Sequence, residues 1–411
     1  MKVLIITQYF WPENFKISDF AVSFKEMGHE VCVLTGIPNY PKGSFYEGYG
    51  FTKPKTEYFK NIKIIRTVLF PRGDASNFRL FLNYLSFAFF ASFAVLFRIK
   101  SNFDLIFVFE TSPITVGIPA IVLKKIRKIP IVLWVLDLWP ESVYALKDFR
   151  SKTLKLYLYK LVKYIYKNCN MIFVSSRSFI KSITEKNIEI DKIRYIPNWS
   201  EDEYLNYNAK EFRLDDKNLP EDGFILMFAG NLGEAQDFES IISAAECLKN
   251  HKDIYWIIIG DGRKKDWIKH KISEKGLSDT VILLGKYPMK TMPHFYSKAD
   301  AMLIALRDEY VFSLTVPAKL QTYMACGKTI LAMINGETAK IIKEAKAGFV
   351  CDSGKYNDFA VNILKLYSMD KGSRQTFGNN ARSYYNAVFN KDKILKDIEK
   401  SFTEVINMTK V

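Results

Sequence analysis

Residues 225–248, ILMFAGNLGEAQDFESIISAAECL, decide the fold of the second half of this chain. An apolar run leads into a turn with two glycines, and a stretch with helical spacing follows. The predicted helix directs its free N–H groups and the positive end of its dipole toward the turn, where Gly230 and Gly233 let a ligand approach the backbone. This strand–turn–helix unit predicts a diphosphate site, although glycines after strands often only make turns.

The same alternation continues to the end of the second half. Gly260, Asp261 and Gly262 follow another apolar run, and Pro317 and Lys319 stand just ahead of a predicted helix at 320–325. A lysine at the start of a helix is electrostatically misplaced unless an anion sits there; the alternative is a solvated surface lysine. The predicted strands of this half are 225–229, 256–259, 281–284, 301–304, 329–332 and 348–350.

The first half has its own β/α series. Residues 2–7 (KVLIIT), 30–34, 62–66, 105–109, 131–135 and 171–174 are predicted strands, and 18–27 is a predicted helix. A polar stretch at 201–222 separates the two series. We therefore predict two doubly wound α/β domains, residues 1–200 and 223–390, that face each other across a cleft. One large α/β domain with an inserted loop is the alternative.

Charge and cysteine content restrict the classes of partner. Residues 1–200 carry a net charge of +14 and residues 201–411 only +1, so the first domain is expected to meet a membrane surface, a phosphorylated lipid or nucleic acid. Five dispersed cysteines and four histidines indicate reduced, cytosolic thiols and no metal site. The apolar run after Lys2 is too short for a signal peptide.

Two segments of the first domain suggest contact with a membrane. The eighteen residues 80–97 (LFLNYLSFAFFASFAVLF) barely reach the length of a bilayer span and interrupt a β/α series, so we expect a buried or membrane-dipping helix. Residues 150–167 place five lysines near helical spacing among leucines, tyrosines and a valine. This pattern is typical of a basic amphipathic helix on an anionic bilayer, and a solvated lysine face is the alternative.

Carboxylates and indoles follow the predicted strands of the first domain. Carboxylates accept hydrogen bonds from sugar hydroxyls, and tryptophan faces favour sugar C–H surfaces. Alternatively, the tryptophans belong to the core and the acids cap helices. The candidates are Asp137, Trp139 and Glu141 after 131–135, Glu110 at the end of 105–109, and Glu13 and Asn14 in the loop after the first strand.

The ordered motifs along the chain resemble those of glycosyltransferase family 4. They include VLIITQYFWPEN, DLWPESV, FAGNLG, IIIGDG, VILLGKYP and VPAKLQTYMACGKTIL. Within the family, the chain is similar to bacterial colanic-acid and O-antigen enzymes, some of them proposed to use N-acetyl-L-fucosamine. The resemblance implies a GT-B fold, a nucleotide-sugar donor in the C-terminal domain, an acceptor in the N-terminal domain, and no metal or cofactor. It also implies a final helix within 391–411 that returns to the first domain.

The sequence departs from the family pattern at several positions. Asn231 and Gln236 replace an arginine and a lysine that hold the diphosphate, and Leu314 and Thr322 replace two glutamates. Leu136 stands where the family often has a histidine, which makes Asp137 the stronger candidate for contact with the sugar or the acceptor hydroxyl. Asp137, Glu13 and Lys319 are the catalytic candidates. The implied donor-binding residues are Gly230, Asn231, Gly233, Gln236, Gly260, Asp261, Gly262, Lys286, Tyr287, Pro317, Lys319, Gln321 and Thr322, and the implied acceptor-binding residues are Asn14, Glu110, Trp139 and Glu141.

The expected activity is retaining transfer of a sugar from a UDP-sugar to a polyprenyl-diphosphate-linked saccharide in capsule or O-antigen synthesis. The enzyme would be cytoplasmic and peripheral on the inner face of the membrane, with no nucleic acid as partner. A nucleotide-sugar epimerase or hydrolase on the same fold is one alternative. A non-enzymatic module that binds nucleic acid or membranes is another, but it leaves the glycine pattern of the second domain unexplained.

Overall fold

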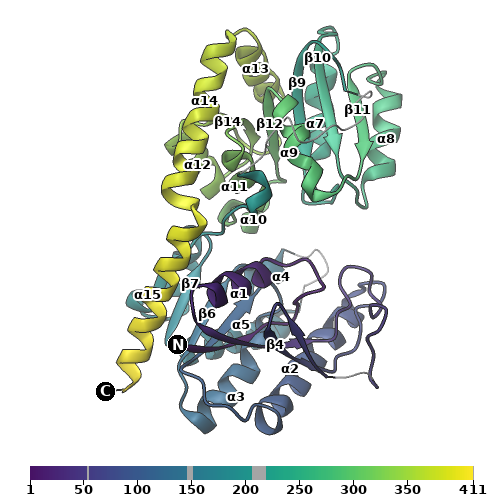
Figure 1. The fold of residues 1–411 in the computed structure, drawn as a ribbon. Coiled ribbons are helices and arrows are strands. Elements are labelled where there is room, and N and C mark those ends of the chain that lie inside the picture. The colour runs from purple at the N-terminus through teal and green to yellow at the C-terminus, as the bar shows by residue number, and fades with distance from the viewer. Residues whose placement is uncertain (53–54, 146–150, 206–218, 411) are drawn as a thin grey trace. The chain divides into compact units, whose positions relative to one another are not determined.

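The computed structural model describes residues 1–52, 55–145, 151–205 and 219–410 and divides the chain into two compact units (Figure 1). Residues 1–196 and 395–411 form the first unit, the N-terminal domain, and residues 197–394 form the second, the C-terminal domain. Much of the linker expected at 201–222 (206–218) and the start of the basic helix expected at 150 lie outside the described residues.

The N-terminal domain is built on one eight-stranded sheet with the order β3-β4-β2-β1-β5-β6-β7-β8. Only β3 runs antiparallel to its neighbour. Each predicted strand is confirmed, whereas β3, an edge strand with alternating exposure, and β8, only three residues long, were not predicted. The strands are β1 Lys2–Ile6, β2 Glu30–Gly36, β3 Thr56–Phe59, β4 Ile62–Thr67, β5 Leu105–Glu110, β6 Ile131–Val135, β7 Met171–Val174 and β8 Ile193–Tyr195.

Helices cover both faces of this sheet. Helix α3 packs against both α2 and α5, and α1 packs against β2 and β4. The last helix, α15, packs beside α1. The ring centres of Phe402 and Phe24 are 5.5 Å apart, and the Glu399 Oε1 lies 2.8 Å from the His29 Nε2. The helices are α1 Lys16–Glu26, α2 Asn77–Phe97, α3 Gly117–Arg127, α4 Glu141–Tyr144, α5 Lys152–Asn168, α6 Ser178–Thr184 and α15 Lys391–Lys410, with 3-10 turns at Ile114–Val116 and Ile190–Lys192.

Helix α2 contains the apolar segment predicted at 80–97. Among the described residues it is the one helix long and apolar enough to cross a membrane, by length and composition alone. It connects β4 to β5 of a single sheet, and 39% of its most apolar window is buried inside the domain. One side of α2 therefore belongs to the core of the N-terminal domain.

The C-terminal domain has a six-stranded, fully parallel sheet with the order β11-β10-β9-β12-β13-β14. All six predicted strands are confirmed. They are β9 Phe224–Ala229, β10 Ile254–Ile259, β11 Val281–Gly285, β12 Ala301–Ala305, β13 Thr329–Met333 and β14 Gly348–Cys351. The helices are α7 Phe238–Cys247, α8 Lys265–Glu274, α9 Met292–Lys298, α10 Tyr310–Leu314, α11 Ala318–Ala325, α12 Glu337–Glu344, α13 Tyr356–Tyr367 and α14 Lys371–Tyr384. Short turns occur at Asp202–Tyr204, Met289–Thr291 and Tyr385–Phe389.

Two hydrophobic cores explain why these strands are continuous apolar runs. Met227 enters the core on one face of the sheet, and its neighbours Leu226 and Phe228 enter the core on the other. A strand covered on both faces needs apolar side chains at successive positions. The strand order reverses between β9 and β12, and between β1 and β5 in the N-terminal domain. At such points the carboxyl ends of the strands form binding crevices.

Candidate functional site

Two glycine turns pack directly against each other at the carboxyl edge of the C-terminal sheet. The first follows β9 and the second follows β10. A Cβ atom on Gly260 would lie 1.8 Å from the carbonyl oxygen of Gly230, so the contact requires glycine. The Leu232 N–H donates to the Asp261 carbonyl at 2.9 Å, and the Lys264 N–H donates to the Leu232 carbonyl at 2.9 Å. The two turns therefore form one continuous backbone surface beside the point where the strand order of the sheet reverses.

Lys319 lies against this surface. A Cβ on Gly230 would stand 2.7 Å from the Lys319 Cε, which shows how closely the chain passes over the glycine. The Nζ donates to the Gln236 Oε1 at 2.5 Å and sits 3.7 Å from the centre of the Phe228 ring. Burial lowers the pKa of Lys319 to about 7. An anion at this edge would favour the charged form of the amine.

Asn231 lies between the two turns. Its side-chain atoms would be 2.6 Å from a Cβ on Gly233 and 2.7 Å from one on Gly262. The Asp261 carboxylate accepts from the Gly262 N–H at 3.0 Å and stands 3.7 Å from the Lys265 Nζ. Asparagine thus fills the space beside both glycines at a position where the family usually has an arginine.

An ion network supports the first turn from outside. Arg307, just after β12, lies 3.3 Å from both Glu234 and Glu239, and Lys264 lies 3.4 Å from the same two carboxylates. The Arg307 N–H also donates to the Ala235 carbonyl at 3.0 Å. The sequence did not predict this network, because the two glutamates lie at least 25 residues from Lys264 and at least 68 residues from Arg307 along the chain. Both glutamates are mostly exposed, so the network positions the loop and adds little stability.

The remaining donor-site candidates are placed differently. The buried Gln321 amide donates within the first turn of α11, to the carbonyls of Pro317 and Ala318 at 3.0 and 3.2 Å. Thr322 is also buried and donates to the Ala318 carbonyl at 3.2 Å. Tyr287 packs on Phe295 at 4.5 Å, beside the exposed Lys286. The structure therefore brings together the glycine turns, Asn231, Asp261, Gln236 and Lys319, and it does not join these other side chains to that cluster.

In the N-terminal domain, Glu13 is a buried anchor for the loops after β1 and β2. Its Oε1 accepts from the Asn39 and Tyr40 N–H groups, both at 2.8 Å, and its Oε2 accepts from the Phe10 N–H at 3.3 Å. Burial raises the pKa of Glu13 to about 7, against the opposing effect of these donors. Asn14 beside it is exposed. The position of Glu13 favours a structural role for a residue that the sequence offered as a catalytic candidate.

Asp137, just after β6, lies near Glu110, the last residue of β5. Asp137 is half-buried, and its Oδ2 accepts from the Trp139 Nε1–H at 3.1 Å. Glu110 is fully buried, and among the described residues neither of its carboxyl oxygens has a hydrogen-bond partner. Burial and the nearby Asp137 charge raise the pKa of Glu110 well above its usual range, and burial also raises the pKa of Asp137. Of these two acids, Asp137 is the one that solvent reaches.

Glu141 is not a free carboxylate. Its Oε1 accepts from the Lys186 Nζ and from the Ser182 hydroxyl, both at 2.7 Å. The Lys186 side chain is 3% exposed, so this ion pair is largely buried between α4 and the residues just after α6. The sequence assigned Glu141 to acceptor binding, whereas the contacts describe a link between two helices.

A polar network at the same edge was not predicted. The Asn83 side chain on α2 accepts from the Gln8 Nε2 at 2.7 Å and donates to the Phe70 carbonyl at 2.6 Å. Arg72 donates to the Tyr9 hydroxyl at 2.6 Å and lies 5.1 Å from the Tyr40 ring. An asparagine inside an apolar helix was the available signal, because a buried amide needs partners.

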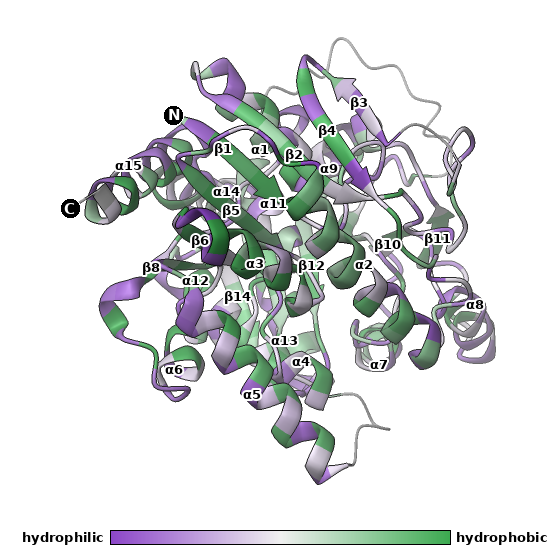
Figure 2. Cartoon of the chain, turned by 90° about the horizontal axis from the view of Figure 1, so that it is seen from below, coloured by the Kyte–Doolittle hydropathy of each residue, from purple (hydrophilic) through white to green (hydrophobic). Residues whose placement is uncertain are grey.

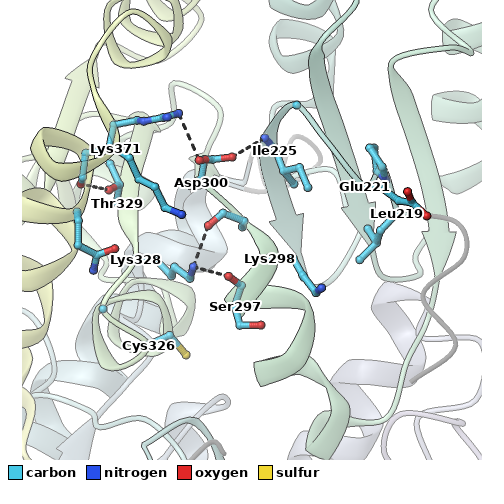
Figure 3. A pocket seen from close by; sticks show the side chains of 16 residues that line it. Leu219, Glu221, Ile225, Ser297, Lys298, Asp300, Cys326, Lys328, Thr329 and Lys371 are labelled. Carbon is cyan, nitrogen blue, oxygen red and sulfur yellow. Dashed lines mark hydrogen bonds and ion pairs between the residues drawn. The ribbon is translucent and has the colours of Figure 1, made fainter. Parts of the chain in front are cut away.

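One hollow lies away from the glycine turns. A cavity of about 720 Å³ lies at the amino edge of the C-terminal sheet (Figure 3). Two of its cations have partners: Lys328 donates to the Ser297 and Ala299 carbonyls at 3.1 and 2.8 Å, and Arg374 lies 3.3 Å from Asp300. Within the described ranges, no three His, Cys, Asp or Glu side chains gather as a metal site requires.

Two family models together match most of the chain. The model described as Glycosyltransferase Family 4 matches residues 17–203, and the model described as Glycosyl transferases group 1 matches residues 209–384. The chain is 23% identical to the putative colanic acid biosynthesis glycosyl transferase WcaI of Escherichia coli, over 96% of this chain and 98% of that protein. It is 27% identical to the probable glycosyltransferase WbjE of Pseudomonas aeruginosa, over 59% of this chain and 61% of that protein.

Solved structures share the fold. Sucrose-phosphate synthase from Thermosynechococcus elongatus superposes with a TM-score of 0.75 at 15% identity, over 99% of both chains. HepE from Anabaena, in complex with UDP and glucose, gives 0.71 at 15% identity, over 98% of this chain and 100% of that one. The glycosyltransferase WaaG, involved in lipopolysaccharide biosynthesis, gives 0.67 at 14% identity, over 98% and 99%. At these identities the likeness establishes the GT-B fold alone.

Proposed function

We propose that this chain, which belongs to the GT-B glycosyltransferases matched by both family models, transfers a sugar from a UDP-sugar to a lipid-linked saccharide in bacterial surface polysaccharide synthesis. The observation that carries the proposal is the pair of interlocked glycine turns with Lys319 lying over Gly230. Backbone N–H groups at a helix start and a nearby cation are suited to a diphosphate. The fold neighbour HepE binds UDP, and the name of WcaI refers to a surface polysaccharide.

The chemistry proposed is retention at the anomeric carbon. The bond between that carbon and the diphosphate oxygen breaks, and an acceptor hydroxyl oxygen bonds to the same face. The hydroxyl proton passes to the leaving phosphate. Lys319 and the backbone N–H groups near Gly230 stabilise the negative charge that develops on the diphosphate. Asp137, within solvent reach, accepts a hydrogen bond from the acceptor hydroxyl or the sugar.

The acceptor and location follow from the basic N-terminal domain. A net charge of +14 over residues 1–200 favours an anionic membrane surface and a polyprenyl-diphosphate carrier, on the inner face of the cell membrane. The resemblance to enzymes proposed to use N-acetyl-L-fucosamine makes an N-acetylated deoxy-amino sugar the first donor to test.

The test begins with a panel of UDP- and GDP-sugars in thermal-shift assays. The best ligand is then incubated with membrane extracts, and release of the nucleotide is measured with and without the extract. Stabilisation by a UDP-sugar and release that depends on the extract support the proposal. Rapid release without any acceptor would favour a hydrolase or epimerase instead.

Two variants connect the activity to the site. Lys319→Ala is expected to weaken donor affinity far more than acceptor affinity, and unchanged donor binding would remove Lys319 from the diphosphate site. Asp137→Asn is expected to lower turnover by about 10²-fold or more while donor binding is kept. Glu246→Gln, on the surface of α7, is the control for both.

A further inference from the structure

Helix α2 presents a continuous apolar stripe on its outer side. The stripe consists of exposed side chains that recur every three or four residues up to the adjacent pair at its end, with fractional exposures between 42% and 70%: Phe78, Phe81, Leu85, Phe89, Phe93, Leu96 and Phe97. The opposite side of the helix is buried and carries Asn83, Phe87 and Ala91. Isolated apolar residues on a surface are ordinary, whereas a contiguous patch marks an interface.

The helices beside the stripe supply cations. Helices α2, α3 and α5 together contain nine Lys and Arg residues and no Asp or Glu. The Lys125 Nζ of α3 lies 5.8 Å from the Tyr164 ring of α5, which joins these two helices. On α5, Leu154, Leu156 and Tyr157 are exposed among the lysines. Figure 2 shows hydrophobic residues along α2 and a mixture of hydrophobic and hydrophilic residues along α5.

This inference rests on the proposed function, which requires a lipid-linked acceptor beside the N-terminal domain. We propose that the outer face of α2, α3 and α5 binds one leaflet of an anionic bilayer, with the α2 stripe among the acyl chains and the α5 lysines at the lipid phosphates. Phenylalanine side chains favour this boundary, and lysine side chains are attracted to an anionic lipid surface. These three helices themselves carry no acidic side chain that would repel the lipid phosphates.

Helix α2 lies in the leaflet and does not cross it. Crossing would expose every side of the helix to lipid, but Asn83 is fully buried and bonded to Gln8 and Phe70. Ser86 on the same side accepts from the Phe70 N–H at 2.9 Å. A span would break these bonds and leave the amide unpaired in hydrocarbon.

The buried side of α2 reaches the candidate acceptor site. Asn83 bonds to Gln8 in the loop after β1 and donates to the Asn39 Oδ1 at 3.3 Å, while the backbone N–H of Asn39 donates to Glu13. The helix that contacts lipid on one side therefore holds the loops of the site on the other. Asn83 is a positioning residue through which membrane contact and acceptor placement are joined.

The first experiment is flotation of the full chain with vesicles. Vesicles of phosphatidylglycerol and phosphatidylethanolamine are compared with vesicles of phosphatidylcholine alone. The wild type is expected to float with the anionic vesicles and to be released by alkaline carbonate. The double variant Phe81→Glu/Phe89→Glu is expected to lose about tenfold or more in partitioning. Val361→Glu, which alters a 64% exposed side chain on α13, is the matched control.

Three results would overturn the membrane-binding face. They are flotation of the double variant like the wild type, equal flotation with both lipid mixtures, and resistance to carbonate. None of these measurements needs a substrate. If no nucleotide sugar stabilises the chain but the chain still floats with anionic vesicles, the result counts against the proposed function alone. If a UDP-sugar stabilises the chain but the chain does not float, the result counts against this inference alone.

The second experiment separates the two sides of α2. Asn83→Leu is expected to keep vesicle flotation and the thermal shift with donor, and to lower transfer to acceptors in membrane extracts by about tenfold. Gln8→Leu removes the same hydrogen bond from the other partner and should reproduce the loss. Unchanged transfer in both variants would remove Asn83 from its positioning role, and loss of flotation in Asn83→Leu would contradict the separation of the two sides.

Discussion

The carboxyl edges of the two sheets are built in opposite ways. The C-terminal edge is made of backbone, with two glycine turns in contact and one lysine over them. The N-terminal edge is made of buried side chains, with Glu13 and Glu141 tied to fixed partners and Glu110 enclosed beside Asp137. A diphosphate is recognised by N–H groups and a cation, so close access to the backbone matters. A hydroxyl acceptor needs carboxylates held in position, and buried contacts hold them.

The largest expected effect tests the side-chain construction of the N-terminal edge. Lys186→Met leaves the Glu141 carboxylate in a largely buried position without its cation, and we expect the free energy of unfolding to fall by about 3–5 kcal/mol. Urea denaturation measures this. The double variant Glu141→Leu/Lys186→Met removes both charges and should recover much of the loss. A single-variant effect below about 1 kcal/mol would show that the pair does not hold α4 to α6.

The next effect tests the backbone construction of the C-terminal edge. Gly260 has a φ of +149°, and in Gly260→Ala the new Cβ would collide with the Gly230 carbonyl. We therefore expect the free energy of unfolding to fall by about 2–3 kcal/mol and donor binding to be lost. Gly276→Ala is the matched control, with φ +63° and nothing within 4 Å of the added Cβ. Gly276→Ala should lower the free energy of unfolding by about 1 kcal/mol and leave donor binding unchanged. Equal behaviour of the two variants would contradict the interlocked turns.

The third effect concerns the pH dependence of stability. The pKa of Glu13 is raised from 4.5 to about 7 in the folded chain, so the native state binds this proton more tightly than the unfolded state. Glu13 should therefore make the free energy of unfolding fall as pH rises from about 4.5 to about 7, by up to about 1.4 kcal/mol per pH unit. Glu13→Gln keeps an acceptor oxygen and should remove this slope, whereas the exposed Glu47→Gln should not. An identical pH profile in Glu13→Gln would show that Glu13 is ionised throughout.

The smallest effect concerns the pH dependence of donor affinity. Lys319 has its pKa lowered to about 7, so it is charged below this pH and loses its proton above it. Donor affinity should fall as pH rises beyond about 7, by at most about tenfold per pH unit. Calorimetric titration should show the Lys319→Ala defect to be larger at pH 6 than at pH 9, with Lys340→Met on α12 as the control. A defect of equal size at both values would exclude a role for the lysine charge.

Regular structure was largely predictable. The six strands of the C-terminal sheet and six of the N-terminal sheet (β1, β2, β4, β5, β6 and β7) were predicted from mainly apolar runs, because strands covered on both faces need apolar residues at successive positions. The predicted helix at 18–27 corresponds to α1 at Lys16–Glu26. The edge strand β3 was missed because its alternating, half-exposed sequence TEYF carries no such run.

The sequence predicted the part of the candidate site that consists of backbone groups, and it did not predict the contacts between side chains. Glycines after strands, followed by a helix, mark Gly230 and Gly260 in the sequence itself, because only glycine tolerates such contacts. From the sequence, Glu141 was predicted as an acceptor-binding residue and Glu13 as a catalytic candidate, and no partner was predicted for Asn83. Their partners lie 45, 26 and 75 residues away along the chain, at Lys186, Asn39 and Gln8.

The sequence by itself determined the two β/α series, the glycine turns, the lysine at the start of α11 and the basic first half. These are local patterns, fixed by hydrophobic period, by backbone freedom and by charge. The tertiary structure alone decided which carboxylates are enclosed and which side of α2 is exposed. Burial and pairing depend on residues that the fold brings together from distant positions, and no local pattern contains that information.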